Sequence, residues 1–487
     1  MSSKQRSDTL SSLVSYTAIA FLLGVLIHAA FPFEKTPSAV IIGLSAASVV
    51  SVLIPHRLRW VAAAIFIGML SGLWRFDVTL PRAIIPEIKF EGVVVETGRY
   101  DVLVRDEASG QKVKVAKRLR VGDRVRVSCN NIEPLQASDR ARFDARKGAW
   151  FSCKGNVAAS RLSQGQAWDM RRVLGAWRTV LTRRIQTILP GDAGALLAGI
   201  LYGERGLSAD ASDAFKTAGM THLIAVSGSN IAIVISLFVP FFLLLGYRRQ
   251  TAIVLAGGAI TLFVVFVGAQ SSVVRAAFMG WLALLARVFG RKASAGRLLI
   301  IAATTIVIFD PWALAFDAGF ALSFLATAGL LYWSGPFQER LKWMPSIGGI
   351  REAAATTLAA TIATFPYSLW AFGGASLAGL LTNLFAVPIG GLAMMWGAVA
   401  VALGPFIPRS EMPARGCLEA MLGIARLSEL APWLKVAWTL PTWGLFITYG
   451  SIAAVFIQHR AKNKRYPQEH TAELEISPLL RRTVRDR

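Results

Sequence analysis

A group of polar and small side chains interrupts the apolar sequence at residues 219–230, which read Gly-Met-Thr-His-Leu-Ile-Ala-Val-Ser-Gly-Ser-Asn. The imidazole of His222, the hydroxyl of Ser227 and the amide of Asn230 could hydrogen-bond across helices or line a wet cavity. Gly228 allows a second backbone to approach closely. Because polar groups at membrane depth are costly, these four residues are candidates for lining a translocation path.

Four more polar residues lie in or beside apolar stretches further along the chain, at Arg275, Asp317, Ser323 and Asn383. Arg275 could face a cavity as a cation that attracts phosphate, snorkel to the surface, or pair with Asp317 in a structural role. One interhelical hydrogen bond, worth about 0.6 kcal/mol on average, would explain any one of these residues. Their accumulation favours a polar path through the membrane.

The composition defines the class of protein that must position these groups. Of the 487 residues, 54% are hydrophobic and 17% are charged, whereas a soluble domain has roughly 25% charged residues. This excludes an ordinary soluble protein, and the high hydrophobic content excludes a disordered one. The formal net charge of +23 indicates an anionic partner, nucleic acid above all, or anionic membrane lipids.

The sequence predicts a mainly α, polytopic helical membrane protein with about 10–12 membrane segments and an inserted small β-barrel domain. We expect three transmembrane helices in 1–74, an extracytoplasmic domain in 75–186, a transmembrane channel domain in 187–458 and a basic tail in 459–487. The apolar runs that predict membrane segments are 12–31, 38–54, 60–74, 222–246, 251–269, 272–289, 297–311, 315–333, 353–372, 375–404 and 438–458.

Basic residues in the short loops predict the orientation, since cytoplasmic loops carry an excess of Lys and Arg. They place block 75–186 outside and both termini in the cytoplasm. This orientation needs one more crossing than the apolar runs provide. We expect Pro388-Ile389-Gly390-Gly391 to break 375–404 into two segments. The alternative is one long tilted helix with the tail outside.

The extracytoplasmic block combines a strand pattern with a strong positive charge. Residues 88–135 alternate apolar and polar side chains, which predicts a small antiparallel barrel resembling an OB-fold. Residues 75–186 contain 23 Lys and Arg against 12 Asp and Glu. With Tyr100, Phe143, Trp150 and Phe151 as stacking platforms, they could bind a single strand. A solvated face near lipid headgroups is the alternative. The candidate DNA-binding residues are Lys112, Lys114, Lys117, Arg118, Arg120, Arg124 and Arg126.

The cysteines favour a disulfide rather than a metal site. Cys129 and Cys153 are the only cysteines in the extracytoplasmic block, and an oxidising compartment would let them pair; two buried free thiols are the alternative. Three cysteines and five histidines in all exclude a Cys/His zinc framework, and we expect neither a metal nor a cofactor. Residues 161–186 predict an amphipathic interfacial helix, followed by two short helices in 192–217.

The stretch His222-Leu223-Ile224-Ala225-Val226-Ser227-Gly228 resembles the His-Leu-x-Ala-Val-Ser-Gly signature of the ComEC-type competence channel family. Stretches 272–276, 310–324 and 383–388 are also similar to that family. The resemblance implies an inner-membrane channel that imports single-stranded DNA during natural transformation. Many members have Leu-His after the Ser-Gly pair, where this chain has Ser229-Asn230, so a role for that second histidine does not carry over.

The sequence contains no His-x-His-x-Asp-His metal motif, so we expect a short form of the family without its metallo-β-lactamase-like domain, and no enzymatic activity. A Walker-type motif is also absent. A separate DNA receptor, motor and nuclease are therefore expected as partners, beside single-stranded DNA and membrane lipids. The alternatives are a transporter of another anionic substrate and, less favoured, an intramembrane serine protease using Ser227 with a histidine.

Overall fold

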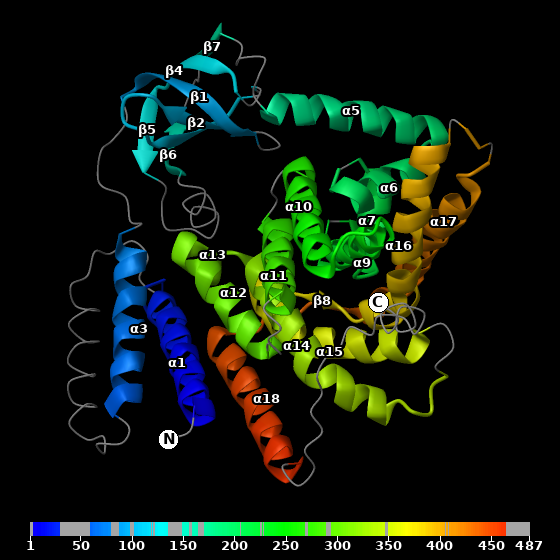
Figure 1. Ribbon diagram of the computed structural model, residues 1–487. Coiled ribbons are helices and arrows are strands. Elements are labelled where there is room, and N and C mark those ends of the chain that lie inside the picture. Colours follow the sequence, from blue (N-terminus) through cyan, green and yellow to red (C-terminus); the bar gives the residue numbers. More distant parts are fainter. Residues whose placement is uncertain are drawn as a thin grey trace.

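The computed structural model is mainly helical, with one large β-sheet inserted between its N-terminal helices and the remaining helices (Figure 1). The structure describes residues 3–29, 59–78, 87–97, 102–117, 119, 122–134, 149–154, 158–163, 170–204, 206–224, 226, 228–267, 271–288, 294–345, 349–404, 406–407 and 409–463.

The sheet contains seven strands in the order β5-β6-β3-β2-β1-β4-β7. All of its neighbouring strands are antiparallel except β3 and β6, which run parallel. As described, the sheet is open, with β5 and β7 at its edges. The strands are β1 (Lys89–Thr97), β2 (Val102–Asp106), β3 (Lys112–Val115), β4 (Arg124–Ser128), β5 (Asn131–Pro134), β6 (Ala149–Lys154) and β7 (Ala158–Ser163).

Alternating side chains give the sheet one buried face. Val113 and Val115 of β3, like Val125 and Val127 of β4, are fully buried in one apolar core. The β-branched valines suit a pleated, half-buried surface. Phe151 also belongs to this core, so the interpretation of Phe151 as an exposed stacking platform is wrong.

The N-terminal helices α1 (Ser3–Ala29) and α3 (Arg59–Asp77) run parallel and touch through glycines. A Cβ added at Gly68 would lie 2.3 Å from the Thr17 carbonyl oxygen, and one at Gly72 would lie 2.2 Å from that of Phe21. Only glycine permits this backbone approach, as in small-xxx-small pairs of membrane helices. The predicted span 38–54 between them lies outside the described residues.

Four helices follow the sheet: α5 (Met170–Ile188), α6 (Asp192–Tyr202), α7 (Ala209–Thr217) and the single turn α8 (Thr221–Ile224). The predicted amphipathic helix therefore starts later than expected, because 158–163 forms β7. Arg178 of α5 donates from Nε to the Phe266 carbonyl at 2.6 Å. A cation at a helix C-terminus satisfies carbonyls that lack partners, so this contact fastens α5 to α10.

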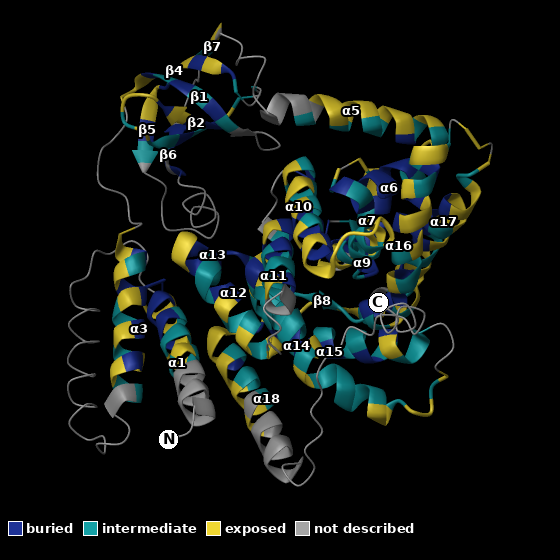
Figure 2. Cartoon of the chain, viewed as in Figure 1, coloured by how far each residue is buried: buried dark blue, intermediate teal, exposed yellow. Residues whose placement is uncertain are grey.

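Except for α13 and α17, the remaining helices match the other predicted apolar runs. Three of them, α10, α14 and α16, are long and apolar enough to cross a membrane, and shorter apolar helices include 230–244, 272–285 and 295–309. Exposed residues lie along parts of α10 and α18 (Figure 2). The helices are α9 (Gly228–Leu244), α10 (Arg249–Val267), α11 (Ser271–Val288), α12 (Ala295–Phe309), α13 (Trp312–Phe316), α14 (Ala318–Arg340), α15 (Ile350–Phe372), α16 (Ala378–Leu403), α17 (Met412–Leu427) and α18 (Thr442–Asn463).

Residues 375–404 do not divide into two segments as predicted. The helix α16 continues from Ala378 to Leu403 with Pro388 inside it. Membrane helices tolerate proline where neighbouring groups compensate for the lost hydrogen bond. A Cβ at Gly390 would lie 3.7 Å from the Met421 methyl, so this glycine faces α17.

Candidate functional site

The outward face of strands β1–β4, here called the basic face, gathers four of the seven predicted DNA-binding residues. The register aligns Lys112, Arg105, Val93 and Arg124 in one row across these strands. Side chains two residues apart on a strand share a face, so Lys114 and Arg126 join them. Arg105, opposite Lys112 and exposed, belongs to the same face. The sequence analysis did not single out Arg105 as a DNA-binding candidate.

Of the other three predicted DNA-binding residues, the structure describes only Lys117. Lys117, just after β3, donates from Nζ to the Ala159 carbonyl at 3.4 Å. Arg118 and Arg120 lie outside the described residues.

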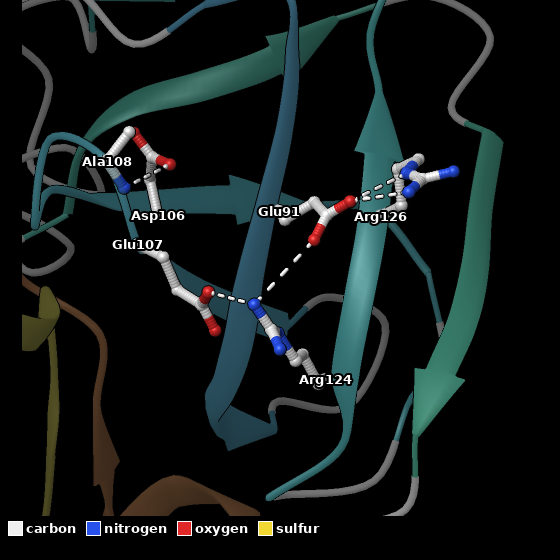
Figure 3. Close-up of polar contacts among 6 residues, drawn as sticks. All are labelled: Glu91, Asp106, Glu107, Ala108, Arg124 and Arg126. Atoms are coloured by element: carbon white, nitrogen blue, oxygen red, sulfur yellow. Dashed lines mark hydrogen bonds and ion pairs between the residues drawn. The ribbon is translucent and has the colours of Figure 1, made fainter.

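Two glutamates neutralise part of the basic face (Figure 3). Arg124 Nη2 lies 2.6 Å from Glu107 Oε2 and 3.8 Å from Glu91 Oε2. Arg126 donates to Glu91 Oε1 from Nε at 2.9 Å and from Nη2 at 2.6 Å. All four side chains are about one-third to two-thirds exposed, so the pairs sit at the surface, where they can exchange with other ions.

The predicted disulfide between Cys129 and Cys153 is present, with Cα atoms 5.5 Å apart. Cys129 directly follows β4, and Cys153 lies in β6 opposite Ile132 of β5. The bond therefore connects two parts of the sheet that are distant in strand order. Cys417 of α17 is a free thiol.

Residues 219–230, here called the signature segment, are held from three sides. Asn230 Nδ2 donates to the Ile200 carbonyl of α6 at 2.7 Å, and the Ser272 hydroxyl of α11 donates to the Val226 carbonyl at 3.2 Å. From α16, the Thr382 hydroxyl donates to the Ala218 carbonyl at 2.7 Å, next to the segment's start.

Two glycines let α16 approach the signature segment. Gly219 has a φ of +68°, and a Cβ added there would lie 3.1 Å from the Gly379 Cα. Asn383, one turn further along α16, is buried, and its Oδ1 has no hydrogen-bond partner among the described residues. His222 is exposed. His222 and Asn383 thus lie within about one helical turn of the close contact between Gly219 and Gly379.

Arg275 and Asp317 meet in a buried ion pair at 3.2 Å. Arg275 Nη2 also donates to the Gly319 carbonyl at 2.8 Å, and Asp317 caps α14 by accepting from the Gly319 backbone N–H at 2.9 Å. The structural alternative for Arg275 is therefore the one the geometry supports. Ser323, one turn into α14, is half-buried.

Three of the eight predicted path residues, Gly228, Arg275 and Asp317, are thus connected through the start of α11. Ser272 contacts the signature segment, a Cβ at Gly228 would lie 3.9 Å from the Ala276 methyl, and Arg275 reaches α14. Ser227, on which the protease hypothesis depends, lies outside the described residues. Within the described part of the chain, no group of three or more His, Cys, Asp or Glu side chains could hold a metal ion.

A polytopic helical membrane protein carrying a basic β-sheet module is the class that these features define. A family model described as competence protein matches residues 200–462, which is more than half of the chain. The chain therefore belongs to the competence protein family, and the match includes the whole signature segment.

A curated relative, ComE operon protein 3 of Bacillus subtilis (strain 168), is 28% identical over 218 residues. The aligned part covers 45% of this chain and 27% of the relative, so the chain matches about a quarter of that protein's length. No solved structure matches the chain.

Proposed function

We propose that this protein is an inner-membrane channel through which single-stranded DNA enters the cell during natural transformation. The observation that carries the proposal is the family match over 200–462, because it contains the signature segment, the Arg275–Asp317 pair and Asn383. The name of the relative, a ComE operon protein, agrees with a role in competence. Membrane helices that carry this many polar groups suit a hydrated path.

We further propose that the sheet is an OB-like barrel that receives DNA. In support, β3 and β6 pair in parallel while β1 pairs with both β2 and β4. Only Cys129 and Asn130 separate β4, which pairs with β1, from β5, which pairs with β6. If β4 and β5 act as one bent strand, the circuit β1-β2-β3-β6-β5/β4 closes as in a Greek-key barrel.

The proposed orientation places the sheet outside and both termini in the cytoplasm. Helices α15 and α18 are antiparallel, since Trp370 donates to the Thr442 hydroxyl at 3.3 Å and Tyr449 to the Ala363 carbonyl at 2.8 Å. The end of α18 therefore lies on the same side as the start of α15. The loop before α15 carries Arg340 and Lys342, which favours the cytoplasm.

We assign the additional crossing to α17. Strands β8 (Ala375–Ser376) and β9 (Lys435–Val436) pair with each other. The segment that connects them, which contains α16 and α17, must therefore start and end at the same depth in the membrane. They lie side by side in Figure 1. The apolar runs in the sequence do not include α17, because the exposed residues Arg415, Glu419 and Arg426 lower its hydropathy.

Single-cysteine labelling tests the orientation. In a Cys417→Ser background, a membrane-impermeant maleimide should label Ala108→Cys in intact cells, and Lys342→Cys and Asn463→Cys only after lysis. Labelling of Asn463→Cys in intact cells would overturn the assignment of α17.

The activity itself is tested in a competent bacterium that lacks its own member of this family. Expression of this chain should restore entry of labelled DNA into a compartment protected from added nuclease. The receptor, motor and nuclease would come from the host, because we propose no enzymatic role for this chain. DNA that binds the cells but stays nuclease-sensitive, with the protein correctly inserted, would contradict the channel function.

A further inference from the structure

We propose that Glu91 and Glu107 are built-in competitors for the basic face, and that they weaken its hold on the phosphate backbone of a single strand. This inference rests on the proposed function, because it concerns the surface that would receive DNA. It assigns a role to two acidic residues that lie in the middle of a surface otherwise suited to anions.

The two carboxylates occupy the positions that phosphates would take. Glu107 lies 2.6 Å from Arg124, and Glu91 accepts both the Nε and Nη2 donors of Arg126. Arginine recognises carboxylate and phosphate with the same planar fork of donors. A phosphate can therefore bind Arg124 or Arg126 fully only by displacing a carboxylate.

The backbone fixes both glutamates in place. Glu91 lies within β1, directly opposite Arg126 of β4. The Glu107 backbone N–H donates to the Glu91 carbonyl at 2.9 Å, which extends the β1–β2 ladder by one step. Buried Asp106 holds the following turn by accepting from the Ala108 backbone N–H at 3.1 Å (Figure 3) and from the Ser109 backbone N–H at 3.0 Å. The carboxylates are thus part of the folded sheet.

The surface pairs are easily exchanged, which makes them suitable competitors. Exposed ion pairs contribute only about 0–1 kcal/mol, and the side chains of Arg124 and Arg126 are 49% and 62% exposed. Conduction through a pore requires binding that is favourable enough for entry and weak enough for release. Competing carboxylates lower the affinity of each contact, so a strand can pass over the face without being trapped.

The test measures binding of a fluorescent thymidine oligonucleotide to the full-length protein in lipid nanodiscs. Glu91→Gln and Glu107→Gln should each tighten binding roughly two- to fivefold, the range expected for exposed pairs. The dependence on salt should steepen, with the slope growing by about 0.7 for each added phosphate contact. Glu419→Gln on α17, exposed and outside the sheet, is the matched control and should change neither quantity.

A double variant shows whether each glutamate acts through its arginine. The gain of Glu91→Gln should largely disappear when Arg126→Gln is also present, because Glu91 then faces only Arg124, which is 3.8 Å away and already paired with Glu107. If the wild type binds the oligonucleotide and neither glutamate variant binds more tightly, the competitor role is wrong while the proposed function stands. If only the glutamate variants bind, the competitor role holds and the native face is no DNA receptor. If none binds, both proposals fail.

Discussion

Arg275 of α11 and Asp317, which caps α14, form an ion pair 42 residues apart in the chain, with Nη1 3.2 Å from Oδ2 and both residues buried. Because Asp317 also caps α14 and Arg275 also binds the Gly319 carbonyl, the pair fastens the start of one membrane helix to another. Arg275 lies next to Ala276, which faces Gly228. The pair therefore supports the position of the signature segment.

Breaking this pair from one side should destabilise the protein strongly. Asp317→Asn or Arg275→Gln leaves one buried charge without its counterion, which costs about 3–5 kcal/mol. The thermal midpoint of the detergent-solubilised protein, followed by tryptophan fluorescence, should fall clearly. The double variant Arg275→Met/Asp317→Leu should recover much of the loss. A single variant as stable as the wild type would show that the pair has no structural role.

The contact between α1 and α3 should depend on the size of two glycines. Gly68→Val and Gly72→Val place side-chain atoms where the Thr17 and Phe21 carbonyls lie, and such overpacking costs about 1–3 kcal/mol. We expect lower thermal midpoints for both. Gly258→Ala in α10, where a Cβ meets nothing within 4 Å, is the control. Equal stability of all these variants would rule out the close packing.

The turn before the signature segment gives a sharper glycine comparison. Gly219 and Gly246 both have positive φ, at +68° and +85°, but a Cβ at Gly246 meets nothing within 4 Å. Alanine at either position adds about 1–2 kcal/mol of backbone strain, and at Gly219 it also collides with Gly379. DNA uptake by Gly219→Ala should therefore fall further than by Gly246→Ala. Equal uptake by the two variants would show that DNA uptake does not depend on the contact between Gly219 and Gly379.

The disulfide should stabilise the sheet and report its compartment. The bond closes a sequence separation of 24 residues, for which the chain-entropy model gives about 3 kcal/mol. The Cys129→Ser/Cys153→Ser variant should lose roughly this amount, measured as increased protease cleavage between residues 89 and 163. Protein extracted under thiol-blocking conditions should carry one modified cysteine, Cys417. Modification of all three would argue that the domain lies in a reducing compartment.

Local sequence patterns were sufficient for much of the fold. The valines of β3 and β4 alternate strictly, and the apolar runs from 251–269 to 438–458 all coincide with helices. Strands β6 and β7 were missed because their alternation is irregular. Helix α17 was missed because Arg415, Glu419 and Arg426 interrupt its apolar sequence. Pro388 suggested a break, but α16 continues through it.

The site was less predictable, because its contacts join residues distant in sequence. The basic run 112–126 indicates a positive face, but Glu91 is 35 residues from Arg126, and only the β1–β4 register brings them together. The same holds for Asn230 and Ile200, which are 30 residues apart. Linear spacing identified the polar groups, whereas tertiary packing decided which of them are neutralised.

Passage of a single strand through the purified full-length protein in a planar lipid bilayer tests directly whether the protein is a DNA channel. Voltage replaces the motor, and a single-stranded oligonucleotide is added on the side of the β-sheet. A channel predicts an ionic current with transient blockades, and oligonucleotide recovered by amplification from the opposite chamber. Oligonucleotide that binds the protein but never reaches the opposite chamber, whatever the voltage, would contradict a passage for DNA through this chain.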